Sequence, residues 1–323
     1  MLEAVAATDT LAGDFRTVTQ ACGLLDRSER GKLALSGDDA VEFLNGQVTN
    51  ELLGLAPGEG RYAAFLTHKG KMLGDLRVLA VTGESGLELL LDTERIALQS
   101  LFDMIRRFRV GYRVELHKRT LERGLLSLIG PRSGEALGVE PGPNEHDNAP
   151  VTLAGIEALA IRTDVGIDLL CDAEDTVELA SALHARGAGP VAPEAAECLR
   201  IESGRPRFGI DLDDTTIPQE AGLNERAVSF TKGCYVGQET VARLFYKGKP
   251  NRHLRGLRLA GPAAPGEELV LRERTIGRLG SVAESPRLGW IGLALLRREA
   301  EPGATVLVGP DAVGAEVVQL PFG

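Results

Sequence analysis

The sequence predicts an α+β protein of two or three domains, with antiparallel sheets and a small C-terminal β-barrel. The chain has 323 residues, and folded domains commonly hold roughly 100–200 residues. Strand-like segments joined by short polar turns recur along the chain, which is typical of antiparallel pairing. The last 70 or so residues hold only short strand-like segments between Gly and Pro turns, a spacing that favours a small barrel.

The first third predicts strands around one clear helix. Residues 31–36 predict a strand, and a short helix follows through Phe43 and Leu44. Residues 61–81 predict a β-hairpin with a polar turn, and residues 87–91 predict another strand. Leu98, Leu101, Ile105 and Phe108 recur at helical spacing, so we expect a helix over 93–110 that Asp92 or Thr93 caps.

The rest of the chain continues the mixed pattern. The segments expected next are a strand at 124–130, a loop at 141–150, a strand pair within 158–171, and helices at 174–186 and 193–204. The expected barrel strands are 254–259, 268–271, 291–295, 305–308 and 316–320.

Composition limits the classes of function. The net charge of −10 disfavours broad binding to nucleic acid or to an anionic membrane. The first residues lack the basic start of a secretory signal, and no apolar run approaches the ~18 residues that span a bilayer. The four cysteines lie far apart, without a C-x-x-C pair or a histidine at metal-ligand spacing. We therefore expect a reduced, cytoplasmic protein without a bound metal or a membrane partner.

The segment at 228–243, VSFTKGCYVGQETVAR, concentrates residues that carry chemistry. Lys232 lies two residues before Cys234, so in an extended segment both side chains project to one face. An ammonium group near a thiol stabilises the thiolate, which favours a reactive cysteine. The alternative is a small buried Cys234 beside a solvated Lys232, since free cysteines are usually buried and inert.

This segment resembles the K-x-C-Y-x-G-Q-E signature of the YgfZ family, relatives of the glycine cleavage T-protein (GcvT) that are implicated in iron–sulfur protein maturation. Upstream, residues 199–223 resemble the paired R-x-E-x-G and P-x-E-A-G-L blocks of T-protein and its folate-binding relatives. Residues 43–52 and 62–78 resemble the N-terminal half of the family. The likeness extends from about Leu44 to Phe322.

The resemblance implies a GcvT-like folate-binding fold, with three modules around a central opening for tetrahydrofolate or a one-carbon derivative. It assigns Cys234, Lys232 and Tyr235 to catalysis. It assigns folate contacts to Glu202, Tyr62, Gly237, Gln238, Glu239 and Arg243. A carboxylate such as Glu202 can accept two parallel N–H bonds from the aminopyrimidine edge of a pterin; the alternative is an exposed carboxylate at a helix end.

The hairpin carries a further acidic group that the resemblance marks. T-protein uses an aspartate of this block in its folate chemistry, and Asp75 is the counterpart here. The usual Asp-Asp pair is Gly74-Asp75 in this chain, so one carboxylate is missing and transferase activity is in question. Asp75 paired with Arg77 on the strand face is the alternative.

A basic stretch follows the cysteine motif. From Arg243 to Arg258 the sequence holds six Lys or Arg residues, both ends included, with Phe245, Tyr246 and His253 among them. Such a stretch can pair with the carboxylates of a folate glutamate tail, contact RNA phosphates, or form a solvated linker.

We therefore expect a tetrahydrofolate-binding accessory protein for maturation or repair of iron–sulfur enzymes, including tRNA-modifying ones, rather than an enzyme. Its partners would be iron–sulfur client or assembly proteins. The alternatives are a folate-dependent aminomethyl or methyl transferase that uses Asp75, and a non-enzymatic RNA or protein adaptor. The expected domains are 1–119, 120–250 and 251–323, the first two of which can interleave in space.

Overall fold

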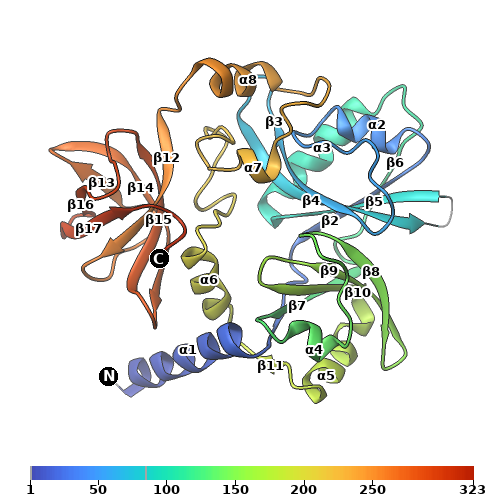
Figure 1. Ribbon diagram of the computed structural model, residues 1–323, viewed down its shortest axis with the longest axis horizontal. Coiled ribbons are helices and arrows are strands. Elements are labelled where there is room, and N and C mark those ends of the chain that lie inside the picture. The colour runs from blue at the N-terminus through green and yellow to red at the C-terminus, as the bar shows by residue number, and fades with distance from the viewer. Residues whose placement is uncertain (1, 84–85) are drawn as a thin grey trace.

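The computed structural model describes residues 2–83 and 86–323. It holds two open sheets, which lie one above the other on one side, and a closed barrel on the other (Figure 1). Helix α6 and the loop after it run between these parts (Figure 1). The predicted α+β class, with antiparallel sheets and a C-terminal barrel, is confirmed.

The first sheet is antiparallel, in the order β3-β4-β5-β2-β6. The predicted hairpin is β3 and β4, closed by a turn in which the Thr67 amide donates a hydrogen bond of 2.8 Å to the Lys71 carbonyl oxygen. Its core of Leu, Phe and Ala side chains is covered by two helices. The elements are β2 (Gly31–Ser36), α2 (Ala40–Asn45), β3 (Gly60–Leu66), β4 (Met72–Gly83), β5 (Gly86–Thr93), η1 (Arg95–Ala97), α3 (Leu98–Phe108) and β6 (Glu115–Lys118).

The helix expected at 93–110 begins later than predicted. Asp92 and Thr93 are the last residues of β5 and do not cap a helix. The carboxylate of Asp92 instead accepts hydrogen bonds from Arg30 and Arg77. These ion pairs stabilise the extended conformation at the end of β5.

The second sheet has the order β11-β1-β7-β10-β9-β8. Its strands are antiparallel except for β1 and β11, which pair in parallel. Helix α5 packs on its apolar face through Leu179 and Leu183. The elements are β1 (Gly23–Asp26), β7 (Arg123–Ile129), α4 (Ser133–Leu137), β8 (Asn148–Leu153), β9 (Ile156–Arg162), β10 (Gly166–Asp172), η2 (Ala173–Asp175), α5 (Thr176–Ala185) and β11 (Gly189–Pro190).

Three further helices, α6, α7 and α8, follow the second sheet in sequence, and α1 (Leu2–Gln20) precedes both sheets. Pro193 occupies the first turn of α6 (Pro193–Glu202), as predicted. The sequence did not predict α1, α7 (Asn224–Ala227) or α8 (Gln238–Lys247). Helix α1 packs on α6 through Phe15 and Val18.

The barrel is closed in the order β12-β15-β14-β13-β16-β17. Strand β13 (Glu268–Leu271) and strand β16 (Thr305–Val308) match the predicted bounds. The long strand β14 (Arg274–Ser285) was missed, and the last predicted strand lies earlier, as β17 (Val313–Val318). The remaining strands are β12 (Arg252–Leu259) and β15 (Gly289–Arg297).

The two open sheets share chain segments. Strand β1 precedes the first sheet in sequence but belongs to the second. Residues from Phe208 to Val241 return to the core of the first sheet. The barrel begins with β12 at Arg252. The division of the chain into domains 1–119, 120–250 and 251–323 stays a prediction. Within 2–83 and 86–323, no helix is both long and apolar enough to cross a membrane.

Candidate functional site

A cavity of about 530 Å³ lies where the two open sheets meet α6. Its walls come from the end of β1 and the loop that follows it, from the hairpin β3–β4, and from the ends of β7 and β10. Helix α6 and the loop after it complete the wall. Arginine and carboxylate side chains dominate the wall, with a few apolar groups. Among the residues that the structure describes, none from the barrel lines this cavity, so two of the three expected modules enclose it. That it is the central opening for folate stays a prediction.

Two sequence-predicted residues meet inside the cavity. Tyr62 on β3 and Asp75 on β4 both line it, and the Tyr62 hydroxyl donates a hydrogen bond of 2.8 Å to Oδ2 of Asp75. Asp75 is 6 % exposed. Burial raises its pKa to about 6, although the bond from Tyr62 acts in the opposite direction. A carboxylate with a pKa near neutrality, facing a cavity, is suited to accept or hold a proton.

Asp75 does not form the ion pair with Arg77 that the sequence left open as an alternative. Arg77 donates from Nε to Asp92 at 2.7 Å and from Nη1 to Asp168 at 2.6 Å. Arg30 binds the same Asp92 through two further bonds of 2.8 and 3.0 Å. These guanidinium groups hold the pKa of Asp92 far below its usual range, against the effect of burial.

This ion-pair network joins the two open sheets. Arg77 belongs to β4 of the first sheet, while Asp168 lies on β10 of the second. The hydroxyl of Ser127 on β7 donates to the other oxygen of Asp168 at 2.6 Å. The sheets are thus fixed to each other directly beside Asp75.

Glu202 does not occupy the expected place. It lies at the end of α6, is 4 % exposed, and faces the barrel rather than the cavity. Ser285 donates a hydrogen bond to one of its oxygens, and Arg287 donates to the other at 2.7 Å. Both oxygens therefore bind groups of the barrel, which corrects the expected pterin contact. The carboxylates that α6 does contribute to the cavity wall are Glu194 and Glu197.

Lys232 is buried, which the extended arrangement with Cys234 did not foresee. Its Nζ donates to the carbonyl oxygens of Asn45, Val48 and Asn50 at 2.7, 2.9 and 2.6 Å. An ammonium group has three donors, so none is left for a thiolate. Burial lowers the pKa of Lys232 to about 8. The residue fastens the loop after α2, which corrects its expected role in activating Cys234.

Cys234 is the exposed cysteine among the four, and the neighbouring Tyr235 is buried. Burial raises the pKa of Tyr235 to about 12. Neither residue is part of the cavity wall. The chemistry expected of Cys234 therefore requires a partner that approaches from outside.

The predicted folate contacts after Cys234 lie on α8 or directly before it, and none of them lines the cavity. Gly237 precedes α8 with φ of +85°, and a Cβ there would lie 2.6 Å from the carbonyl oxygen of Thr67. Its glycine is required where α8 meets the hairpin turn. Gln238 is half-buried, whereas Glu239 and Arg243 are exposed.

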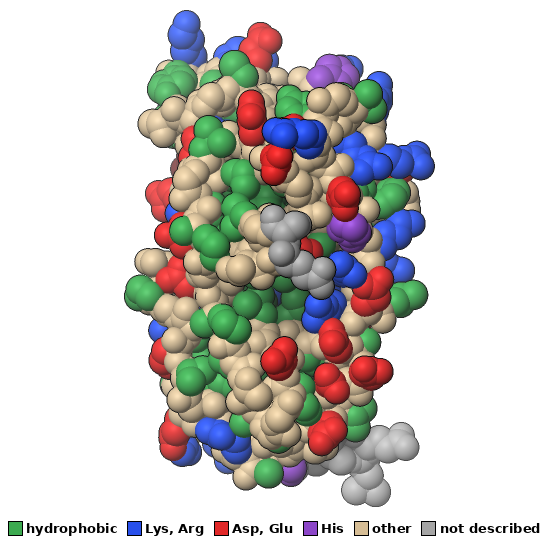
Figure 2. All heavy atoms as spheres, turned by 90° about the vertical axis from the view of Figure 1, so that its right-hand side faces the viewer, with side chains coloured by type: hydrophobic (Ala, Val, Ile, Leu, Met, Phe, Trp, Pro, Cys, Tyr) green, Lys and Arg blue, Asp and Glu red, His purple; other side chains and the backbone are tan. Residues whose placement is uncertain are grey.

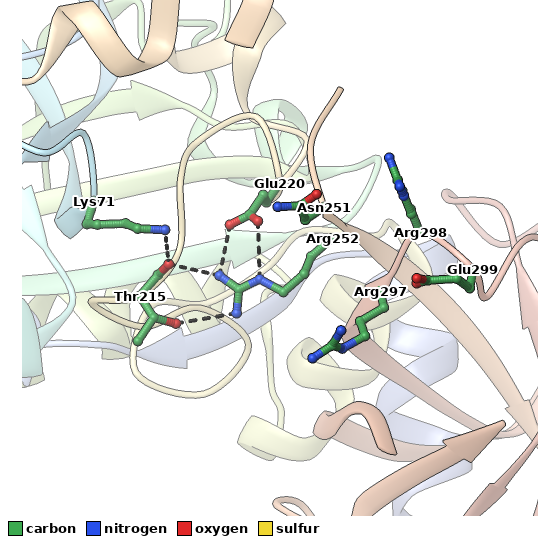
Figure 3. Close-up of a pocket in the computed structure, with 8 residues that line it drawn as sticks. All are labelled: Lys71, Thr215, Glu220, Asn251, Arg252, Arg297, Arg298 and Glu299. Atoms are coloured by element: carbon green, nitrogen blue, oxygen red, sulfur yellow. Dashed lines mark hydrogen bonds and ion pairs between the residues drawn. The ribbon is translucent and has the colours of Figure 1, made fainter. Parts of the chain in front are cut away.

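The basic stretch divides between solvent and an interdomain contact. Arg252 binds Glu220 through bonds of 2.8 and 3.2 Å and donates to the Thr215 carbonyl at 2.8 Å (Figure 3). Lys71 donates to the same carbonyl at 2.6 Å. These residues line a second pocket at the surface, which is separate from the cavity that holds Tyr62 and Asp75 (Figure 3). The hairpin turn, the loop before α7 and the barrel meet there. The guanidinium group of Arg252 is therefore already bound within the protein, to Glu220 and Thr215.

Surface charge bears on the RNA alternative. On the face shown in Figure 2, acidic side chains gather in the lower half. That half corresponds to the second sheet in Figure 1. Acidic groups repel nucleic acid phosphates, so the lower half of this face does not favour RNA binding.

Sequence reasoning missed several cavity residues. Arg30 and Asp168 carry no motif, and their role depends on strand register that brings distant segments together. His146 and Arg226 lie on loops or a short helix flanking the cavity. A positive φ at His146 has no signal in a single sequence.

Comparison with known proteins gives a consistent pattern. The GCVT N-terminal domain family matches residues 4–232, and the glycine cleavage T-protein C-terminal barrel domain family matches residues 252–322. The chain is 30% identical to a protein of Arabidopsis thaliana named putative transferase At1g60990, chloroplastic, over 93% of this chain and 71% of that protein. It is 31% identical to an aminomethyltransferase of Streptomyces coelicolor, over 93% and 86% of the two chains.

A solved structure supports the same fold. The crystal structure of the glycine cleavage system aminomethyltransferase T from Bartonella henselae superposes with a TM-score of 0.84. It is 23% identical and covers 97% of this chain and 89% of the other. At this identity the likeness establishes the fold alone.

Proposed function

The chain belongs to the glycine cleavage T-protein family, and from that premise we propose that its central cavity binds a tetrahydrofolate for one-carbon transfer at Asp75. The observation that carries the proposal is the hydrogen bond between half-buried Tyr62 and buried Asp75 in the cavity wall. Relatives named aminomethyltransferase favour this function over the non-enzymatic accessory role expected from the sequence.

The proposed chemistry follows from the state of Asp75. If a tetrahydrofolate is bound, its ring secondary amine would form a bond to the one-carbon unit while the bond from that carbon to the sulfur of the lipoyl donor breaks. The electron pair of the broken bond would leave with the donor as a thiolate, and the amine nitrogen would give up its proton to a base. With a pKa of about 6, Asp75 is largely ionised at neutral pH and can take that proton. Tyr62 fixes the carboxylate orientation through its hydrogen bond.

The proposal places this role on one carboxylate alone. Gly74 stands where the T-protein pattern has a second aspartate, and its φ is +156°. A Cβ at this position would lie 2.6 Å from Ala97 Cβ and from the Phe65 ring. A larger side chain is therefore excluded by packing. The geometry at Asp75 does not depend on a second acidic group.

Two measurements test the proposal together. Calorimetric titration with tetrahydrofolate should show binding to the wild-type chain. An assay with a carrier protein that bears an aminomethyl group on its lipoyl arm should show transfer that depends on tetrahydrofolate. Binding without transfer from any aminomethyl or methyl donor would restrict the cavity to a carrier role, and no binding would refute the proposal.

A second candidate, maintenance of iron–sulfur enzymes, rests on Cys234. Its thiol is exposed within the K-G-C-Y segment, whereas the other cysteines are buried. In cells that lack the protein, the Cys234→Ala variant should then fail to restore iron–sulfur enzyme activity, including that of tRNA-modifying enzymes. Full rescue by this variant would remove the candidate.

A further inference from the structure

His146 lies in the cavity wall in an unusual backbone conformation. Its φ is +75°, in the left-handed region, which only a few per cent of non-glycine residues adopt, with His, Asn and Asp the most frequent among them. The surrounding chain enforces it: the His146 amide donates to the Arg162 carbonyl at 2.9 Å. A Cβ on Gly60 would lie 2.5 Å from the His146 carbonyl oxygen. Strain that a structure holds in this way is concentrated at functional sites.

The imidazole is buried but has no hydrogen-bond partner. The residue is 7 % exposed, and neither Nδ1 nor Nε2 meets a donor or acceptor among the described residues. The nearest carboxylate oxygen, on Glu145, is 3.7 Å from Nε2, beyond hydrogen-bond reach. Two unsatisfied ring nitrogens disfavour the folded state unless another molecule supplies their partners.

The ring is neutral at working pH. Burial, followed by the charges of Arg77 and Arg226, lowers the pKa of His146 to about 3. A neutral imidazole offers one donor and one acceptor. Its nearby charges, Glu145 and Arg226, are paired with each other. The ring therefore suits an uncharged polar group of a ligand.

His146 also stands beside the proposed reacting pair. Its ring centroid is 6.2 Å from that of Tyr62, and the Arg226 guanidinium lies 4.9 Å from the Tyr62 centroid on the ring face. All three side chains line the same cavity. A flat heterocycle that reaches Asp75 can thus contact His146.

We infer that His146 is a ligand-contact residue, which holds an uncharged amide or ring-nitrogen edge of the folate heterocycle against the Tyr62–Asp75 pair. This inference rests on the proposed function. Under this inference, the loop before β8 that carries His146 serves ligand binding rather than packing of the core.

The test uses His146→Phe, which keeps a flat ring of similar size and removes both nitrogens. The variant should raise the dissociation constant for tetrahydrofolate about 3- to 10-fold, the effect of one or two neutral hydrogen bonds. Its thermal midpoint should stay the same or rise by roughly 1–3 °C, since two unsatisfied polar atoms are removed. The KM for tetrahydrofolate should rise while the acid limb of the pH–rate profile stays in place.

His184→Phe is the matched control, because Nδ1 of His184 already has a partner in the Ala188 carbonyl at 3.0 Å. It should leave the dissociation constant unchanged. If wild type binds tetrahydrofolate and His146→Phe binds it equally well, His146 is a packing residue and the inference is overturned alone. If wild type itself does not bind tetrahydrofolate, the proposed function fails with it.

Discussion

The hydroxyl of Tyr62 lies 2.8 Å from Oδ2 of Asp75, and both side chains are set in the wall of the central cavity. The two residues lie on neighbouring strands of one hairpin, where Tyr62 pairs with Arg77 and Ala64 pairs with Asp75. The contact is therefore diagonal across the ladder, within reach of a long aromatic side chain. Local β-structure alone brings the pair together.

Removing the Tyr62 hydroxyl should raise the pKa of Asp75 further. The hydrogen bond favours the ionised carboxylate, so Tyr62→Phe removes a stabilising contact from that form. The acid limb of the pH–rate profile should move above pH 6, toward higher pH, by about one unit. A profile that stays in place would show that Tyr62 does not control the ionisation of Asp75.

The contact between Arg77 and Asp168 should be important for stability. Asp168→Ala leaves a buried guanidinium with one of its two carboxylates, and breaking a buried pair commonly costs about 3–5 kcal/mol. Denaturant titration should show this loss of unfolding free energy. Glu135→Ala, which breaks the exposed pair with Arg132, should leave stability unchanged. Equal effects of the two variants would contradict a supporting role for the network.

Lys232 should act on folding rather than on chemistry. Lys232→Met leaves three carbonyl oxygens of the 45–50 segment without a donor, which should lower the unfolding free energy by about 2–4 kcal/mol. Lys249→Met, at an exposed position, is the control. A Lys232 variant as stable as wild type would contradict this assignment.

Cys234 should be the cysteine that alkylates first in the native protein. Burial raises the pKa of Cys22, Cys171 and Cys198, the last to about 12, which suppresses their thiolates. Mass spectrometry after brief iodoacetamide treatment should find label at Cys234. Because the Nζ donors of Lys232 are occupied, labelling should not depend on that ammonium group. Faster labelling of a buried cysteine would contradict the account.

Local signals predicted three parts of the fold. Strand-like segments around turn residues predicted the hairpin β3–β4 and the barrel, and Pro193 and Gly204 at its two ends predicted helix α6. Helix α1 was missed, since its apolar face is completed only by packing on α6.

The functional site was harder to predict from the sequence than the fold. Tyr62 and Asp75 followed from the family resemblance of the hairpin segment, but the orientation of Glu202 depends on where the barrel docks. Likewise, Lys232 turns inward because the loop after α2 presents three carbonyls that no sequence pattern marks.

Asp75→Asn, assayed across pH together with wild type, tests the central claim most directly. With saturating tetrahydrofolate, wild-type transfer should fall tenfold per pH unit below about 6, because the protonated carboxyl cannot accept the proton. The variant should lose roughly 10²- to 10⁴-fold in rate at pH 7.5 while it binds tetrahydrofolate within about threefold of wild type. A variant that transfers at the wild-type rate would contradict the assignment of Asp75.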